Sequence, residues 1–249
     1  MSGHSKWATT KHRKGAIDKA RGKLFAKLIR QVEVAAREGG GDVNANATLR
    51  TMFAKARDAS VPLDTIERAI KRGTGELEGV RYEAVSYEGY APSGVAVIVE
   101  CLTDNRNRTS ADIRSLLSRN GGSMAEPGSV SWQFTRKGVV ILPKSVLEDE
   151  LMALALEQGA EDLADEGDEW MLTSAPGELP GLREALEKAS IGIEHADVEL
   201  VATTRVAVEE PGVARRVLRL IELLEDHDDV QNVWSNFDIP EEILESVEA

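Results

Sequence analysis

The sequence has little of what an exported, membrane-spanning or disulfide-stabilised protein needs. Its single cysteine, Cys101, has no partner for an internal disulfide and lies among apolar residues, which indicates a buried small side chain. The longest apolar runs, such as residues 95–99, are far shorter than the ~20 residues that cross a bilayer. The first residues are polar and basic, unlike the apolar segment of a secretory signal. We therefore expect a cytoplasmic protein without a membrane span.

The motifs of common enzyme classes are also missing. The sequence has no G-x-x-x-x-G-K-S/T phosphate loop, no H-E-x-x-H helix, no G-x-S-x-G elbow and no C-x-x-C pair. His4 and His12 lie among cations, which disfavours a metal ion there. The acidic run at residues 225–229 has no established ligand spacing, so we interpret it as a solvated turn. The sequence predicts a protein that is not an enzyme, with no catalytic residue, no metal site and no cofactor.

What the chain does have is a strong division of charge. Its 249 residues are 42% hydrophobic and 29% charged, which is typical of a globular protein, and the length predicts two or three domains. Residues 1–73 carry 16 Lys/Arg against 7 Asp/Glu, residues 74–144 carry 8 of each, and residues 145–249 carry 6 against 28. This asymmetry is typical of a nucleic-acid-binding arm joined to an acidic body, although acidic residues also serve solubility alone.

The cations are densest at the start, where residues 1–37 carry ten Lys/Arg and two acids. Such a segment with a tryptophan suits nucleic acid, because phosphate attraction is independent of sequence and an indole stacks on a base; the alternative is a solvated terminus. The spacing of Leu24, Leu28 and Val32 predicts a helix over residues 16–38 with these side chains buried and a basic stripe opposite. The candidate nucleic-acid-binding residues here are His4, Ser5, Lys6, Trp7, Lys11, His12, Arg13, Lys14, Lys19, Lys23, Lys27 and Arg30.

A second candidate segment is T-D-N-R-N-R-T at residues 103–109, between a predicted strand and a predicted helix. Asp104 or Asn107 is suited to cap that helix. Cations at a helix start oppose the helix dipole, so Arg106 and Arg108 indicate a bound anion or, equally, a structural ion pair with a carboxylate. Both arginines join the candidate nucleic-acid-binding residues.

The hydrophobic periodicity predicts an α+β protein with a small helical domain at the N-terminus. After Pro62, Asp64 and Glu67 resemble a capping box at the start of a third helix, with Gly73 following its end. A strand is predicted around Trp132, because Val130, Trp132 and Phe134 alternate with polar residues. Residues 136–201 have the order β-α-β-β-α-β of a ferredoxin-like unit.

The predicted elements before that unit and those after it are too few to form two separate cores, so we expect the two groups to form one domain together. The predicted organisation is a helical domain at residues 1–76, a discontinuous α+β domain at 77–135 plus 202–239, an inserted ferredoxin-like α+β domain at 136–201, and an acidic tail at 240–249. The ferredoxin-like domain is thus the third domain, inserted into the second.

Several motifs resemble the YebC/PmpR family, in order and over nearly the whole chain: G-H-S-K-W-A at residues 3–8, R-G-K-L-F at 21–25, R-A-I-K-R-G at 68–73, T-D-N-R-N-R-T at 103–109 and D-D-V-Q-N-V at 228–233. The resemblance implies the same three-domain arrangement. It also implies a regulator of transcription that binds DNA, or a translation factor, since the family is related to the mitochondrial translational activator of cytochrome c oxidase subunit I. Bacterial members are linked to ribosomes at proline-rich stretches. It supplies no catalytic residue.

Three functions stay open from the sequence. The first is a non-enzymatic DNA-binding transcriptional regulator whose cationic N-terminus holds phosphates. The second is a ribosome- and RNA-binding translation factor that assists synthesis of difficult proline-rich stretches. The third is a protein-interaction adaptor whose acidic C-terminal half contacts basic protein surfaces. No recognition-helix signature predicts sequence specificity.

Overall fold

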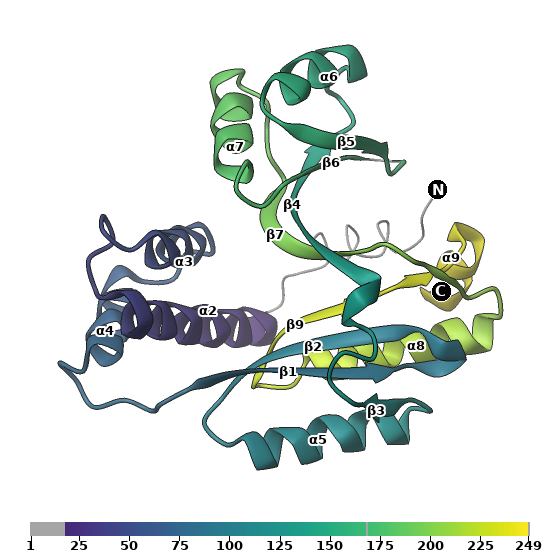
Figure 1. Ribbon diagram of the computed structural model, residues 1–249, viewed down its shortest axis with the longest axis horizontal. Coiled ribbons are helices and arrows are strands. Elements are labelled where there is room, and N and C mark those ends of the chain that lie inside the picture. The colour runs from purple at the N-terminus through teal and green to yellow at the C-terminus, as the bar shows by residue number, and fades with distance from the viewer. Residues whose placement is uncertain (1–17, 168, 249) are drawn as a thin grey trace.

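The computed structural model describes the backbone of residues 18–167 and 169–248, with side chains described from residue 22 to residue 247 apart from 168 (Figure 1). A group of helices comes first and is followed by two α+β units, each built on a four-stranded sheet. This arrangement confirms the predicted fold class. Within the described residues, no helix is both long enough and apolar enough to cross a membrane.

From residue 18 onward the N-terminal unit has three helices, α2 (Asp18–Gly39), α3 (Ala47–Asp58) and α4 (Leu63–Thr74). Leu28 and Val32 of α2 are buried with Leu49 and Ile66, as the periodicity predicts. Leu24 was expected on the same buried face, but it is 47% exposed. The reason is length: α2 has 22 residues against 12 in each of its partners, and its first turns extend past them (Figure 1).

The ends of α4 differ from the prediction. The helix begins directly after Pro62 without a side-chain cap, so the capping box of Asp64 and Glu67 does not form; Asp64 already lies inside the first turn. Gly75, with φ of +84°, ends the helix, and Gly73 lies within it. A Cβ atom at Gly73 would stand 2.4 Å from the carbonyl oxygen of Glu33, so the glycine permits close packing of α4 on α2.

The second unit has a sheet in the order β3-β1-β2-β9, with every neighbouring pair antiparallel. Its strands are β1 (Glu83–Tyr90), β2 (Ala96–Thr103), β3 (Ser123–Ala125) and β9 (Val230–Ser235). A short 3₁₀ helix, η1 (Pro92–Gly94), joins β1 to β2. A small parallel pair, β8 (Val206–Ala207) with β10 (Phe237–Asp238), accompanies the sheet.

The continuous apolar run of β2 is explained by burial on both faces. Val97, Val99 and Cys101 pack with α5 (Arg106–Arg119) and α8 (Pro211–Glu225). Ala96 and Ile98 face the other way, toward Val130 and Phe134. Burial raises the pKa of the Cys101 thiol to about 12, so the thiol stays protonated at neutral pH.

The C-terminal residues belong to this core. Residues 240–249, predicted as an acidic tail, contain the helix α9 (Glu241–Glu248), and Leu244 is buried against the α8 side of the sheet. Glu242 and Glu245 of α9 are exposed while Leu244 is buried, so this acidic segment forms an amphipathic helix.

The strand predicted around Trp132 does not form. Residues 131–133 are a 3₁₀ helix, η2 (Ser131–Gln133), and Trp132 is 69% exposed. The carboxylate of Glu88 accepts hydrogen bonds from the backbone N–H groups of Gly128 (2.8 Å), Val130 (2.6 Å) and Ser131 (3.0 Å). These bonds bend the backbone into a turn, which breaks the alternation that the sequence suggests.

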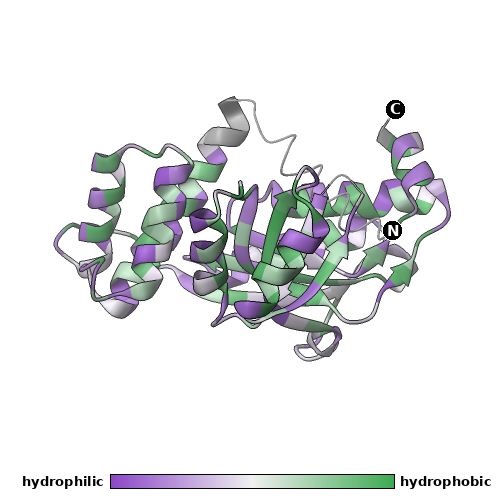
Figure 2. Cartoon of the chain, turned by 90° about the horizontal axis from the view of Figure 1, so that it is seen from above, coloured by the Kyte–Doolittle hydropathy of each residue, from purple (hydrophilic) through white to green (hydrophobic). Residues whose placement is uncertain are grey.

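The third unit is ferredoxin-like, as predicted. Its elements are β4 (Phe134–Pro143), α6 (Glu148–Glu157), β5 (Ala160–Asp165), β6 (Glu169–Ser174), α7 (Leu179–Lys188) and β7 (His195–Ala202). The antiparallel sheet has the order β5-β6-β4-β7. Leu151 of α6 and Leu182 of α7 are buried against Val140 and Leu172 of the sheet. Figure 2 shows, for the whole chain, strands that are mostly hydrophobic and helices that carry both hydrophobic and hydrophilic residues.

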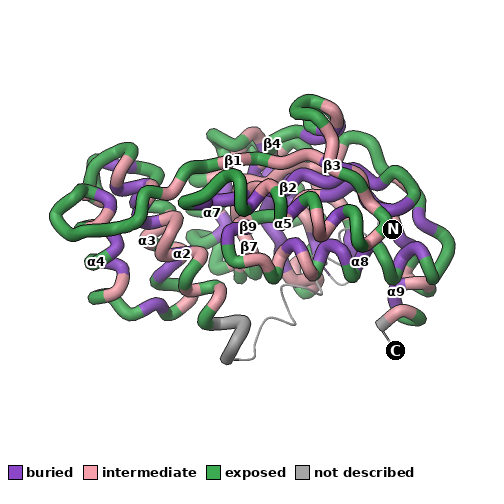
Figure 3. Tube along the Cα trace, turned by 90° about the horizontal axis from the view of Figure 1, so that it is seen from below, coloured by how far each residue is buried: buried purple, intermediate pink, exposed green. Residues whose placement is uncertain are grey.

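The third unit is inserted into the second. β2 pairs directly with β9, although all of β4 to β7 lie between them in sequence. The helical unit touches both: α2 reaches the end of α8, and Lys55 of α3 is ion-paired with Asp197 of β7 at 2.5 Å. The connection at residues 76–81, between α4 and β1, is exposed along its length (Figure 3).

Candidate nucleic-acid interface

Three cations of α2 point at the end of α8: Lys23, Lys27 and Arg30. Lys23 is ion-paired with the carboxylate of Asp226 and donates a hydrogen bond to its backbone carbonyl at 3.0 Å. Lys27 donates to the carbonyl oxygen of Glu225 at 2.7 Å. The last carbonyl groups of a helix carry negative partial charge, so they are favourable partners for a cation. We call this set of contacts the α2–α8 contact.

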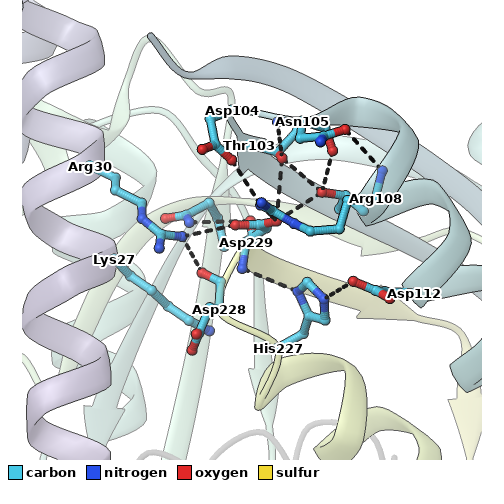
Figure 4. A network of polar contacts seen from close by, with 12 residues as sticks. Lys27, Arg30, Thr103, Asp104, Asn105, Arg108, Asp112, His227, Asp228 and Asp229 are labelled. Carbon is cyan, nitrogen blue, oxygen red and sulfur yellow. Dashed lines mark hydrogen bonds and ion pairs between the residues drawn. The ribbon is translucent and has the colours of Figure 1, made fainter. Parts of the chain in front are cut away.

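Arg30 completes the α2–α8 contact one turn further along α2 (Figure 4). Its guanidinium donates to the carbonyl oxygen of Asp228 and lies 3.4 Å from Oδ1 of Asp229. It also stands over the ring of Tyr82, with 5.4 Å between Cζ and the ring centroid. Gln31 adds a 3.2 Å hydrogen bond from Nε2 to the amide oxygen of Gln231. The first domain therefore meets the second through side chains that the sequence predicts as phosphate ligands.

Asp229 is the centre of the network on the other side of the contact. The residue is 4% exposed, and its Oδ2 accepts hydrogen bonds from Arg108 Nη2 (2.8 Å) and Thr109 Oγ1 (2.8 Å). Thr103 Oγ1 lies 3.3 Å from the same oxygen. The backbone N–H of Asp229 donates a hydrogen bond to Nδ1 of His227 at 3.2 Å. The interpretation of residues 225–229 as a solvated turn is therefore wrong for Asp229, whose carboxylate is buried and hydrogen-bonded.

The pKa of Asp229 reflects two opposed effects. Burial raises the pKa of this carboxyl, but the hydrogen bonds from Arg108 and Thr109 and the positive charges of Arg108 and Arg30 outweigh burial. The pKa of Asp229 is therefore lower than that of an ordinary aspartate, and the carboxylate is ionised throughout the physiological range.

This shift predicts a pH-dependent stability. Because the folded-state pKa of Asp229 lies below its unfolded-state value of about 3.9, its ionisation stabilises the fold fully above that value, and the contribution is lost as the pH falls through the folded-state pKa. We expect Asp229→Asn to lower the free energy of unfolding most near about pH 7, with the difference from the wild type shrinking below about pH 4. Urea unfolding at several pH values measures this. A difference that grows as the pH falls would contradict the assignment.

The two predicted arginines of α5 have different environments. Asn105 caps the helix by accepting from the N–H of Arg108 at 3.1 Å, in place of the expected Asp104 or Asn107. The guanidinium of Arg108 is also ion-paired with Asp104 at 2.8 Å, so the structural ion pair is formed. The side chain of Arg106 makes no ion pair with the residues that the structure describes.

These side chains surround a cleft of about 600 Å³ between the first and second domains, which we call the interdomain cleft. Its lining residues are Lys23, Arg30, Tyr82, Asp104, Arg108, Asp112, Asp226, His227, Asp228 and Asp229. The three cations come from segments about eighty residues apart in the sequence. Five carboxylates accompany them, so the cations are already neutralised in this arrangement.

The structure brings four of the predicted residues together. Lys23, Lys27, Arg30 and Arg108 share one network, and Arg106 lies on the same α5 turn as Arg108. Lys19 is in the first turn of α2, where side chains are not described. The other predicted residues lie outside the described part of the chain: His4, Ser5, Lys6, Trp7, Lys11, His12, Arg13 and Lys14.

The residues that sequence reasoning missed are the carboxylates, Asp226 and Asp229 above all. Arginines at the start of a helix indicate a carboxylate partner, but the sequence does not identify which of the 43 acidic residues it is. Within the described residues, no group of three or more His, Cys, Asp or Glu side chains is arranged to hold a metal ion.

The chain has a three-domain architecture: a helical domain, an α+β domain and a ferredoxin-like domain inserted into it. Comparison with known proteins identifies the family that shares this architecture. The model of the TACO1/YebC protein N-terminal domain matches residues 5–76, and that of the TACO1/YebC second and third domain matches residues 82–237. The chain belongs to the TACO1/YebC family. This confirms the resemblance found in the sequence.

Curated relatives match over the whole length. A "Probable transcriptional regulatory protein" of Acidothermus cellulolyticus is 56% identical over 99% of this chain and 100% of the relative. "Probable transcriptional regulatory protein SCO1521" of Streptomyces coelicolor is 55% identical, and the match covers 100% of both chains. The crystal structure of the conserved hypothetical protein Aq1575 from Aquifex aeolicus superposes with a TM-score of 0.86 at 46% identity, covering 96% of this chain and 99% of that one.

Proposed function

We propose that this protein is a non-enzymatic regulator of gene expression that binds nucleic acid, and specifically a DNA-binding transcriptional regulator. One observation carries the proposal: the two cationic segments of the sequence meet at one cleft, with Lys23 and Arg30 on one wall and Arg108 on the other. The names of the full-length relatives support the regulatory role. The N-terminal cations, together with Trp7, extend the same function by phosphate attraction and stacking.

Phosphate and carboxylate compete for the same cations. In the arrangement described above, Lys23 contacts Asp226 and Arg30 contacts the carbonyl of Asp228, so a phosphate reaches them only when the α2–α8 contact opens. The cost at Lys23 is moderate, because Lys23 and Asp226 are solvent-accessible and exposed ion pairs contribute only about 0–1 kcal/mol each, whereas Arg30 also gives up its contact with the buried Asp229. A polyanion that offers several phosphates at once replaces several such contacts together.

This competition predicts that removing the acids strengthens binding. Asp226 and Asp228 are exposed, and Asp228 contacts Arg30 through its backbone, so Asp226→Asn with Asp228→Asn preserves the buried network. Two fewer negative charges beside the cations should tighten duplex DNA binding about tenfold, at ~1 kcal/mol or less per charge in high dielectric. Fluorescence anisotropy with labelled duplex measures the affinity. Unchanged or weaker binding would contradict the competition.

The proposal itself is tested by binding to duplex DNA at physiological salt, with the salt dependence recorded. A phosphate-binding protein loses affinity linearly in log salt, with a slope of about −0.9 per phosphate contacted. A slope near zero, or no measurable binding at micromolar protein, would refute the nucleic-acid function.

The alternative is a ribosome- and RNA-binding translation factor that assists difficult proline-rich stretches. The charge distribution favours it: residues 134–202 carry 16 Asp/Glu against 5 Lys/Arg, so a large polyanion would attract the N-terminal cations and repel the third domain. A competition separates the two functions. Ribosomes that displace the protein from labelled duplex at far lower molar concentration than unlabelled duplex does would favour translation, and the reverse order would favour transcription.

The second alternative is a protein-interaction adaptor, in which the basic N-terminus has no ligand of its own. It predicts that removing residues 1–37 leaves all binding in cell extract unchanged. Loss of nucleic acid from the bound fraction would exclude the adaptor as the main function.

A further inference from the structure

The third domain carries apolar side chains on both sides of α6. The helix contains the apolar run L-M-A-L-A-L at residues 151–156. Leu151 and Ala155 are buried against the sheet, but Met152 is 44% exposed and Leu156 is 66% exposed. Positions four apart lie on the same side of a helix, so Met152 and Leu156 form one outer apolar face.

Exposed apolar side chains that gather on one side of a helix are normally covered by a partner. Figure 1 shows α6 at the outer end of the third domain, on the side away from α2, α5 and α8. Leu147, directly before the helix, is also 66% exposed. No described part of the chain covers the side of α6 that carries Met152 and Leu156, and exposed apolar side chains gathered on one side mark an interaction site.

The charges around the outer apolar face of α6 indicate which kind of partner covers it. Four exposed acids surround the apolar face on the same helix: Glu148, Asp149, Glu150 and Glu157. α6 carries no lysine or arginine, and residues 134–202 have a net charge of −11. Nucleic acid, an anionic membrane and a second copy of the same domain are all repelled by this surface. A cationic protein segment is attracted.

We infer that the outer face of α6 is a docking site for a cationic amphipathic segment of a partner protein. Apolar side chains of the segment pack on Met152 and Leu156, and its lysines or arginines meet the surrounding carboxylates. The site lies apart from the cations of α2 and does not depend on the proposed nucleic-acid function.

The test uses the full chain and two labelled synthetic peptides of about 18 residues, long enough for about five helical turns. Both contain the same leucines and lysines; in one the leucines fall on a single helical face, and in the other they are permuted around the helix. The amphipathic peptide should bind about tenfold more tightly than the permuted one. Met152→Gln with Leu156→Gln should remove that preference, while duplex DNA binding stays unchanged.

A matched control places two glutamines at exposed leucines away from α6, Leu63→Gln in α4 with Leu77→Gln in the connection after it, each 44% exposed in the wild type, and should leave the preference intact. The inference is overturned if neither peptide binds, if both bind equally, or if the preference survives in the α6 variant. Sedimentation of the wild type gives a further outcome: a dimer that the α6 variant abolishes would assign the face to a second copy instead.

Discussion

Replacing Lys23, Lys27 and Arg30 together by glutamine is expected to weaken binding to duplex DNA by about 100-fold at physiological salt. Each cation contributes ~1 kcal/mol to phosphate binding, and losing three contacts should reduce the salt slope by about 2.7. The measurement is a titration of labelled duplex at several salt concentrations. The same substitutions break the α2–α8 contact, so loss of that contact must be separated from loss of the cations.

Two controls make this separation. Arg215, Arg216 and Arg219 are exposed on α8 and provide an equal loss of charge away from the interdomain cleft. Their glutamine variants should bind nearly as well as the wild type. The acid variant Asp226→Asn with Asp228→Asn weakens the same contact but should strengthen binding. Equal losses in the α2 and α8 variants would contradict the assignment, because net charge alone would then explain both.

Asp229→Ala is expected to lower the free energy of unfolding by about 2–4 kcal/mol. The substitution leaves the guanidinium of Arg108 and the hydroxyl of Thr109 without their 2.8 Å partner, and removing one member of a buried charged network costs far more than an exposed ion pair contributes. Urea unfolding at about pH 7 measures it.

The matched control for Asp229 is Asp104. Its carboxylate binds the same arginine at 2.8 Å, but its side chain is 41% exposed. Asp104→Ala should therefore cost less than about 1 kcal/mol. Equal effects at the two positions would show that burial of Asp229 is not what makes its network stabilising.

Much of the fold was predictable, because its strongest signals are local. The periodicity of α8 matched burial of Val213, Val217 and Leu224, and the order β-α-β-β-α-β defined the ferredoxin-like unit. The failures came from non-local contacts. Trp132 sits in an apolar and polar alternation, yet three N–H groups near it bind Glu88 from a distant strand. Leu24 has the spacing of a core residue, but the partner helices end before they reach it.

In the candidate site, the cations were predictable from the sequence but their carboxylate and carbonyl partners were not. Lysines and arginines at helical spacing identify a cationic surface without knowledge of the fold, so Lys23, Lys27 and Arg30 emerged from the sequence. Their partners did not emerge from the sequence, because 198 to 203 residues separate each cation from its partner at the end of α8 and only the folded chain brings them together. The burial of Asp229 follows from its position between α8 and β9, which is likewise a property of the tertiary structure.

The central claim is that nucleic acid binds along the cationic side of α2, and site-specific photo-cross-linking tests it most directly. Ala26 is exposed and lies on the same side of α2 as Lys23 and Arg30, so it accepts a benzophenone amino acid without loss of a cation. Met152 on α6, 44% exposed, is the matched position on the acidic third domain. With labelled duplex DNA at physiological salt, we predict cross-linked DNA from position 26 and none from position 152. Bound DNA that cross-links at position 152 as strongly as at position 26, or not at all at position 26, would contradict the account.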